Sequence, residues 1–421
     1  MKRTLFLVAA LGILLCTAEA QTPYKVRPDA LPPLQENIGA KALQMAASVD
    51  EMVSWDRYPT YETYLAMMQQ WADDYPSLCH IDTIGYSKQG RLILSIYIEG
   101  GGGYDNLKPE FFYTSTIHGD EVTGYVMLLH LIDTLLASYG NNGRITELLD
   151  RTCISINPIA NPDGTYHNGN HTVQGSVRYN ADGLDLNRCY PDPFGPNNFT
   201  VPQENQAMID YVSAHHFLLS ANLHGGSEVM NYPWDCFTSA SRPHPQAEWW
   251  REVGQRFVDS ARVVDNYCFR DVSQSGVIAG GDWYVIHGGR QDYMNYYHRC
   301  LEMTMEVSSI KTLQSERLPH YWQVLATSLI NYIDEIHSLP EDVAIRNPQS
   351  TLPLIAVWPN PTSDVIHFDG LSDGTQVEIL NAATGIETDA AIFHSSLDVS
   401  ALPSGVYILR VGTMSAKIVK K

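Results

Sequence analysis

The sequence is poor in positive charge. Its 27 Lys and Arg residues stand against 47 Asp and Glu residues, which gives a formal net charge of −20. A polyanion such as the backbone of a nucleic acid would be repelled, so we expect no nucleic-acid partner. Low-complexity tracts and internal repeats are also lacking. With 44% hydrophobic and 18% charged residues, the composition predicts a globular protein with one large domain and one small domain.

A long apolar run is missing as well. The apolar stretch from Leu5 to Leu15 is shorter than the roughly 20 residues that span a bilayer. Two cations precede it, and Ala18-Glu19-Ala20 follows it. This pattern predicts a secretory signal peptide over residues 1–20, with an uncleaved anchor or a lipid-modified Cys16 as alternatives. We therefore expect export, with residues 21–55 as an N-terminal segment before the main domain.

Cysteine is scarce beyond the predicted signal peptide. The remaining residues of this type are Cys79, Cys153, Cys189, Cys236, Cys268 and Cys300. In the oxidising compartment that export implies, these thiols could form disulfides. The residues themselves leave the pairing open, because spacing does not choose among the combinations.

Strand-like and helix-like patterns alternate along most of the chain. Apolar runs of strand length occur at Ile93–Ile98, Phe111–Ile117, Cys153–Ile159, Phe217–Leu223 and Leu301–Val307, and helical periodicity occurs near Tyr61–Tyr75, Val122–Tyr139, Glu204–Ala214, Gln246–Val258 and His320–His337. This alternation predicts an α/β domain over residues 56–338, with a mixed, largely parallel sheet and helices on both faces. Ligands of such sheets bind at the carboxyl ends of the strands.

The pattern changes after His337. Residues 339–353 are polar and contain proline, as expected of a linker. Residues 354–421 then show short strand-like runs at Val365–Phe368, Gln376–Leu380, Val406–Val411 and Ala416–Val419. The spacing predicts a small all-β, sandwich-like domain, and its lack of clustered His, Cys or paired acids assigns it no chemistry.

Two predicted strands end in residues that bind metals. His118 and Glu121 follow the first of these strands, and His224-Gly225-Gly226 follows the second. His nitrogen and carboxylate oxygen are zinc ligands, and a catalytic zinc keeps three protein ligands and one open position. Taken singly, each stretch has an ordinary alternative, a turn with a solvated acid or a hydrogen-bonded core histidine. Together, at two strand ends, they favour a metal site.

A third strand carries acids on one face. Glu302, Thr304 and Glu306 alternate with apolar residues, so their side chains share one side of the strand. A carboxylate beside a metal could act as the general base that activates a water. The alternative is an edge strand whose two glutamates face solvent, and periodicity alone does not separate the two.

Taken together, the motifs carry a family resemblance. His118 and Glu121, "NPDG" (161–164), "RYNADGLDLNR" (178–188), "ANLHGG" (221–226), "NYPWD" (231–235), "GGDWYVIHGGRQD" (280–292) and "EMTMEVS" (302–308) occur in the order and approximate spacing of the zinc metallocarboxypeptidases. The chain is most similar to the carboxypeptidase N/E-like branch. The resemblance runs from about Tyr58 to His337 and implies the carboxypeptidase-like α/β fold.

The resemblance implies a role for each matching residue. One zinc ion would be bound by His118, Glu121 and His224, and Asp185 would orient the first of these histidines. Zinc and Glu306 would activate the attacking water, and zinc and Arg178 would stabilise the oxyanion. The C-terminal carboxylate of a peptide substrate would be held by Asn187, Arg188 and Tyr284, which suits the planar fork of arginine.

Specificity is implied in the same way. Asp235 matches the acid that lines the pocket for a basic side chain in this branch, and Gln291 matches its pocket glutamine. We therefore expect release of C-terminal Lys or Arg from peptides or proteins. A buried acid forms an ion pair with a basic side chain, whereas other side chains leave its charge without a partner. Asp235 could instead be a turn residue. Two other functions stay open: hydrolysis of cell-wall peptides that end in diaminopimelate, and metal-dependent binding without turnover.

The C-terminal region resembles a different family. "VWPNPTSDVIHF", "VEILNAATG", "LDVSALPSGVYILRV" and "AKIVKK" are similar to the C-terminal sorting domain of the type IX secretion system. This resemblance implies contact with that machinery and a secreted or cell-surface protein. In the catalytic region, Cys189-Tyr190 departs from the family pattern, which puts the local packing or a disulfide in question. Cys268 and Cys300 lie where the branch has a disulfide, so we expect that pair. The oligomeric state is not predicted.

Overall fold

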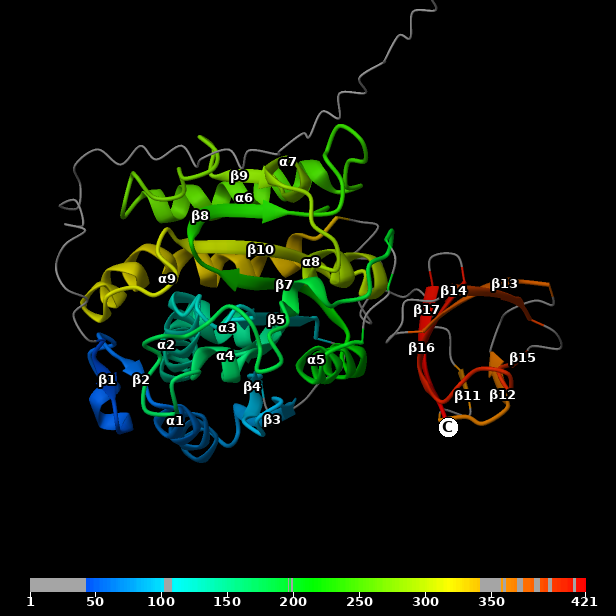
Figure 1. Ribbon diagram of the computed structural model, residues 1–421, viewed down its shortest axis with the longest axis horizontal. Coiled ribbons are helices and arrows are strands. Elements are labelled where there is room, and N and C mark those ends of the chain that lie inside the picture. Colours follow the sequence, from blue (N-terminus) through cyan, green and yellow to red (C-terminus); the bar gives the residue numbers. More distant parts are fainter. Residues whose placement is uncertain are drawn as a thin grey trace, which may run out of the picture.

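The computed structural model describes residues 43–101, 108–195, 197, 200–340, 357–358, 361–368, 374–381, 387–392, 396–411 and 414–421. A large α/β unit and a smaller all-β module lie within these ranges (Figure 1). The predicted signal peptide lies outside the described residues, as does most of the predicted linker. None of the helices in the described ranges is both long enough and apolar enough to cross a membrane.

The large unit is built around one eight-stranded sheet with the order β3-β4-β6-β5-β7-β10-β8-β9. Its strands are β3 (Cys79–Tyr86), β4 (Leu92–Ile98), β5 (Glu110–Ser115), β6 (Cys153–Asn157), β7 (Phe217–His224), β8 (Ser227–Tyr232), β9 (Val277–Ala279) and β10 (Leu301–Ser308), while β1 (Met45–Ala46) and β2 (Tyr58–Pro59) form a separate pair. The four middle strands, from β6 to β10, run parallel, and β3, β4 and β8 add antiparallel pairs. The mixed, largely parallel sheet is confirmed.

Helices cover both faces of this sheet (Figure 1). They are α1 (Tyr61–Asp74), α2 (Thr123–Ser138), α3 (Gly143–Arg151), α4 (Pro162–Thr165), α5 (Gln203–Ala214), α6 (Ala247–Arg262), α7 (Gly280–Trp283), α8 (Arg290–Tyr293) and α9 (Leu318–Asp334), with 3₁₀ turns at Val49–Met52, Leu186–Arg188, Ser315–Arg317 and Glu335–Ser338 and a π turn at Met294–His298. One apolar cluster joins α1, α2, α6 and α9, and a second joins α5, α8 and the π turn. Phe111 faces the first cluster and Phe112 the second, as expected of a central strand covered on both sides.

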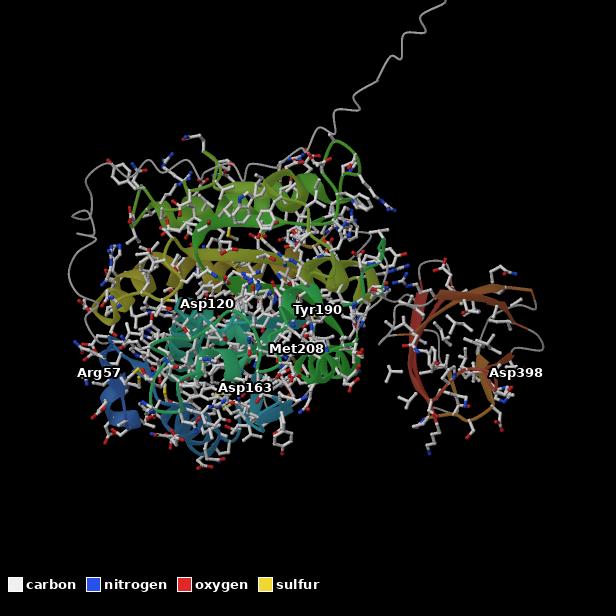
Figure 2. The ribbon with its side chains drawn as sticks, viewed as in Figure 1. Arg57, Asp120, Asp163, Tyr190, Met208 and Asp398 are labelled. Atoms are coloured by element: carbon white, nitrogen blue, oxygen red, sulfur yellow. The ribbon has the colours of Figure 1, made fainter. Side chains whose placement is uncertain are left out.

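The C-terminal module is formed by two small sheets. Strands β11 (Val357–Trp358), β12 (Val365–Phe368) and β15 (Ser396–Asp398) form one, and β13 (Gln376–Asn381), β14 (Glu387–Ala391), β16 (Gly405–Val411) and β17 (Met414–Lys420) form the other. Asp398 marks this module in Figure 2, whereas Met208 and Tyr190 lie in the packed interior of the large unit. The guanidinium of Arg410 in β16 donates to the carbonyl oxygen of Tyr296 at 2.7 Å, which ties the module to the large unit.

The predicted disulfide between Cys268 and Cys300 is wrong, because both are free, buried thiols. Cys300 lies just before the first residue of β10 and donates to the Ser220 hydroxyl at 3.2 Å, whereas Cys268 lines a small cavity beside Val307, near the other end of the same strand. A strand rises about 3.3 Å per residue, so the two cysteines lie far beyond the roughly 7 Å Cα separation that a disulfide spans. The other mature cysteines are free and buried too.

Candidate active site

The first half of the candidate site lies in the turn between β5 and α2. Glycine is required at position 119 because a Cβ there would lie 2.5 Å from the Cα of Gly164, so the turn packs directly on α4. The Gly119 amide donates to the carbonyl oxygen of Arg178, and the Glu121 amide donates to that of His118. The turn therefore holds His118 and Glu121 at the carboxyl end of β5, where both side chains are buried.

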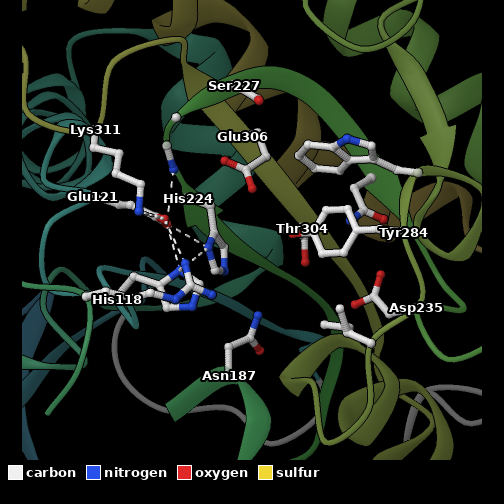
Figure 3. A pocket seen from close by; sticks show the side chains of 16 residues that line it. His118, Glu121, Asn187, His224, Ser227, Asp235, Tyr284, Thr304, Glu306 and Lys311 are labelled. Atoms are coloured by element: carbon white, nitrogen blue, oxygen red, sulfur yellow. Dashed lines mark hydrogen bonds and ion pairs between the residues drawn. The ribbon is translucent and has the colours of Figure 1, made fainter. Parts of the chain in front are cut away.

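His224 brings a third ligand group from the end of β7. Its Nδ1 lies 2.8 Å from Glu121 Oε2 and 3.1 Å from His118 Nδ1, and His118 Nδ1 lies 3.0 Å from the same carboxylate oxygen. The three residues are buried and offer one ligand atom each within 4.8 Å of one another. Two imidazole nitrogens and one carboxylate oxygen thus converge from two strand ends (Figure 3).

The charges of this cluster compensate one another. Burial alone would raise the pKa of Glu121, but His118 and His224 outweigh burial and hold that pKa well below its usual range. Burial lowers the pKa of His224, which favours the neutral imidazole that binds metals. For His118, burial is outweighed by Glu121 and Asp185, so its pKa is raised.

Asp185 and Arg178 lie behind His118. Asp185 Oδ1 is 3.2 Å from His118 Nε2, the ring nitrogen that faces away from Glu121. The guanidinium of Arg178 donates to Asp185 Oδ2 at 3.0 Å, and its NH1 lies 3.2 Å from His118 Nδ1. A carboxylate on the distal nitrogen fixes the tautomer and the ring orientation of a metal-binding histidine. The Arg178 guanidinium thus lies next to the cluster of His118, Glu121 and His224 and lines the pocket in front of it.

The donor set fits zinc. Two His nitrogens and one Glu oxygen, with an open side toward a pocket, form the ligand set of a catalytic zinc site. The short distance between the two Nδ1 atoms, 3.1 Å, is accounted for when both lone pairs point at one cation. We therefore take His118, Glu121 and His224 as the residues that would hold the ion.

Glu306 lies in β10, which pairs with both β7 and β8 in the middle of the sheet. This position excludes the solvent-exposed edge strand that the sequence left open: Glu302 and Glu306 are both buried. Glu302 forms an internal ion pair with Arg290 at 3.0 Å, whereas Glu306 Oε2 finds no hydrogen-bond partner among the described residues. Burial and then the charge of Glu121 raise the pKa of Glu306 well above its usual range. An unpartnered buried carboxylate beside the metal ligands is available to a water or a substrate.

A pocket of about 180 Å³ connects these groups (Figure 3). Among the residues singled out from the sequence, its walls contain His118, Glu121, Arg178, Asn187, His224, Asp235, Tyr284 and Glu306. Asn187 accepts from the backbone amide of Arg290 at 2.9 Å, so its side-chain amide nitrogen is the donor that it can offer to a ligand. Tyr284 is about half exposed, and burial of its hydroxyl raises its pKa to about 12.

Three of the predicted residues do not line the pocket. Asp185 contacts His118 from behind, and Arg188 donates to the Asn187 carbonyl oxygen at 2.8 Å. Gln291 lies behind Asp235 and donates to its Oδ1 at 2.9 Å, while the side-chain oxygen Oε1 of Gln291 accepts from the backbone amide of Thr304 at 2.6 Å. Gln291 therefore orients Asp235 instead of facing a ligand.

Asp235 closes the end of the pocket away from the metal ligands (Figure 3). It is 3% exposed, and its backbone amide donates to Asp292 Oδ1 at 2.8 Å. Burial and then the charge of Asp292 raise the pKa of Asp235 well above its usual range. Burial likewise raises the pKa of Asp292, to about 6. Two buried carboxyl groups thus share one region, and a cation entering the pocket would relieve their repulsion.

The sequence reading missed three residues that shape the site. Asn231 and Lys311 line the pocket, and Asp292 supports Asp235. Asn231 and Asp292 fall within the quoted motifs but were not singled out. Lys311 follows the last quoted motif closely, and its ammonium lies 3.1 Å from Glu121 Oε1. The contacts of Asp292 and Lys311 join segments that are distant in sequence.

Comparisons with known proteins identify the families of the two parts of the chain. Residues 64–328 match the family model described as zinc carboxypeptidase, and residues 356–421 match that of the secretion system C-terminal sorting domain. Mouse carboxypeptidase M is 34% identical over 306 residues, which cover 67% of this chain and 66% of that protein. Rat carboxypeptidase D is 32% identical over 294 residues, which cover 66% of this chain and 21% of that protein. The chain thus spans under two thirds of the length of both relatives.

Solved structures share the fold of the large unit. Thrombin activatable fibrinolysis inhibitor superposes with a TM-score of 0.58 at 17% identity, covering 67% of this chain and 75% of that chain. Carboxypeptidase A from Helicoverpa armigera gives 0.57 at 18% identity, covering 69% and 76%. At this level of identity, the likeness shows the carboxypeptidase fold of the large unit.

Proposed function

The chain belongs to the zinc carboxypeptidase family, and from this premise we propose that it hydrolyses the last peptide bond of peptides or proteins and releases C-terminal Lys or Arg. One observation carries the proposal. A single pocket holds three converging zinc-type ligands, the unpartnered carboxylate of Glu306 and, at its other end, the buried Asp235. The first two features suit hydrolysis, and the third suits a basic side chain.

The terminal residue of the substrate would lie in the half of the pocket that contains Asn187 and Asp235. The Asn187 amide would hold the free carboxylate, with Tyr284 closing over it from its half-exposed position. The guanidinium of Arg188, which donates to the Asn187 carbonyl oxygen outside the pocket wall, would add positive charge next to the carboxylate. Asp235 would form an ion pair with a Lys or Arg side chain. Because carboxylate and side chain are both fixed, the bond one residue upstream reaches the metal ligands, which restricts hydrolysis to the chain end.

The chemistry would be shared among three groups. His118, Glu121 and His224 would hold a zinc ion, which would supply Lewis acidity for a water and for the carbonyl oxygen of the substrate. Glu306 accepts the proton of the attacking water and returns it to the nitrogen of the leaving residue. The guanidinium of Arg178 donates to the carbonyl oxygen as that oxygen gains negative charge, and Asp185 keeps Arg178 oriented for this task.

The C-terminal module would direct the protein out of the cell. Its match to the secretion system sorting domain supports export through the type IX machinery, and then a place outside the cell or on its surface. Deleting residues 354–421 should leave the enzyme in the periplasm, as fractionation of cells that express both forms would reveal. Recovery of the shortened chain in the medium would contradict this part of the proposal.

The activity is tested with blocked dipeptides that end in Arg, Lys, Phe or Glu, using purified mature protein loaded with zinc. We expect release of Arg and Lys, loss of all release after dialysis against a chelator, and recovery when zinc is returned. Preferred release of Phe would keep the zinc mechanism and remove the role of Asp235. If no dipeptide is cleaved but diaminopimelate-containing cell-wall peptides are, the enzyme is a cell-wall amidohydrolase.

A further inference from the structure

A lysine lies on the wall of the pocket farthest from Asp235. Lys311 follows β10 and lines the same pocket, and Figure 3 shows it beyond Glu121 and His224, on the side opposite to Asp235. Its ammonium lies 3.2 Å from Asp120 Oδ2 and 3.1 Å from Glu121 Oε1. The Lys311 side chain is 40% exposed, and Asp120 is not among the residues that line the pocket. A ligand in this part of the pocket therefore contacts the Lys311 ammonium before it reaches the Asp120 carboxylate.

The position of Lys311 is fixed by its backbone and its stem. The amide of Val122 donates to the Lys311 carbonyl oxygen at 3.0 Å, and the hydroxyl of Thr312 donates to the carbonyl oxygen of Asp120 at 3.0 Å. At Gly226, which has φ 109°, a Cβ would lie 3.3 Å from Lys311 Cγ. The second glycine after His224 thus leaves room for the lysine stem to cross the turn. The loop that contains Lys311 and Thr312 is thus hydrogen-bonded to the turn that contains His118 and Glu121.

The direction of a bound peptide follows from the proposed function, on which this inference rests. The released residue occupies the half with Asn187 and Asp235, and the bond to be cut lies at the metal ligands. The residues upstream of that bond must leave the centre on the opposite side. There the described wall contains Gly225, Gly226, Ser227 and Lys311.

We propose that Lys311 selects the residues upstream of the cleaved bond, favouring an acidic side chain there and disfavouring a basic one. The Lys311 ammonium lies 3.3 and 3.2 Å from the two Asp120 oxygens and 3.1 Å from Glu121 Oε1, so a substrate carboxylate would compete with Asp120 for its donors. Glu121 is committed to the metal site, which leaves Asp120 as the acid that partly neutralises the lysine. The enzyme would then select charge of opposite sign on the two sides of the bond, basic after it and acidic before it.

The test uses the full zinc-loaded protein and two sets of blocked peptides, Ala-Xaa-Arg and Xaa-Ala-Arg, with Glu, Gln or Lys as Xaa. The first release of Arg is measured as kcat/KM at low and high salt. We expect the unaltered protein to prefer Glu over Lys by about 5-fold in at least one set, and to lose part of that preference at high salt. Lys311→Met should bring the ratio to about 1, and Lys311→Arg should retain it.

Two further variants sharpen the test. Asp120→Asn removes the competing carboxylate, so it should increase the preference for Glu. Lys88→Met is the matched control, because Lys88 forms an exposed ion pair with Asp182 outside the pocket. It should leave the ratio unchanged.

The failures of the two proposals can be told apart. If Lys311→Met lowers kcat/KM equally for all peptides, Lys311 only supports Glu121, and the selective role is overturned. If the unaltered protein releases Arg through Asp235 but shows no preference upstream in either set, the present inference fails and the proposed function stands. If no peptide loses Arg, the proposed function fails, and the inference fails with it.

Discussion

The two ends of the pocket treat buried acids in opposite ways. At the metal end, Glu121 lies between two histidines that hold its pKa well below the usual range. At the other end, burial and the neighbouring Asp292 raise the pKa of Asp235 well above it. The first acid is paired with two imidazoles of this chain, whereas the second accepts from the neutral amide of Gln291. The metal end is thus preorganised for an ion, while the other end holds a carboxyl group whose ionised form a basic substrate would stabilise.

The local backbone explains why the second end carries two acids. Asp292 accepts from the backbone amides of Asp235 and Cys236 at 2.8 and 2.9 Å, so its carboxylate holds the loop in place. Asp235 is thereby aimed into the pocket, with Gln291 donating to its Oδ1. Burying two carboxyl groups together costs free energy unless a cation joins them. In the empty site this burial lowers the stability of the protein, and binding of a basic side chain would offset the loss.

The largest expected effect comes from breaking the metal end. Glu306→Gln keeps the size of the side chain but removes the proton acceptor, so kcat should fall by roughly 10²- to 10⁴-fold for every substrate. Metal content, measured by elemental analysis, should stay at the level of the unaltered protein, because Glu306 is not one of the three ligands. Retained turnover with normal zinc content would show that another group accepts the proton.

A smaller and selective effect is expected from the other end. Asp235→Asn keeps an oxygen to accept from Gln291 but removes the charge, so kcat/KM for Arg and Lys substrates should fall by roughly 30-fold or more, from about 2–5 kcal/mol for a buried charge pair. Release of Phe should be unchanged or faster, because the like charge of Asp292 is relieved. The exposed Asp182→Asn is a matched control. An equal loss for Arg and Phe would mean that Asp235 supports the fold of the loop instead of reading the side chain.

Much of this comparison could be predicted from the sequence at the metal end. His118 and Glu121 lie shortly after β5 and His224 is the last residue of β7, and the carboxyl ends of parallel strands meet at one edge of a sheet. Strands β5, β7 and β10 were predicted because their apolar content is high. The residue types of the metal ligands and their places at strand ends are local features, so the sequence alone can predict both.

The rest depends on contacts between distant segments. Asp292 reaches the Asp235 amide across 57 residues, and Lys311 reaches Asp120 across 191. The spacing of residues in the sequence does not indicate which distant side chains come into contact. For the same reason, the pairing of Cys268 with Cys300 that the resemblance implied was wrong. Strand β8 was missed because it buries polar residues, among them Glu228, whose carboxylate accepts from the Phe269 amide.

The smallest expected effect is on stability, and its pH dependence isolates the charge of Asp235. In the unfolded chain this carboxyl loses its proton near pH 4, while in the folded protein burial and Asp292 keep the proton bound to higher pH. The folded state is therefore destabilised progressively as pH rises above 4 toward the folded pKa, and Asp235→Asn should remove this loss. With zinc present throughout, the melting temperature of Asp235→Asn should exceed that of the unaltered protein at pH 8, by about 2–4 °C for each kcal/mol relieved, and the gap should shrink toward pH 5. If the difference in melting temperature stayed constant from pH 5 to pH 8, the raised pKa would not belong to Asp235. The proposed difference between the two ends of the pocket would then be wrong.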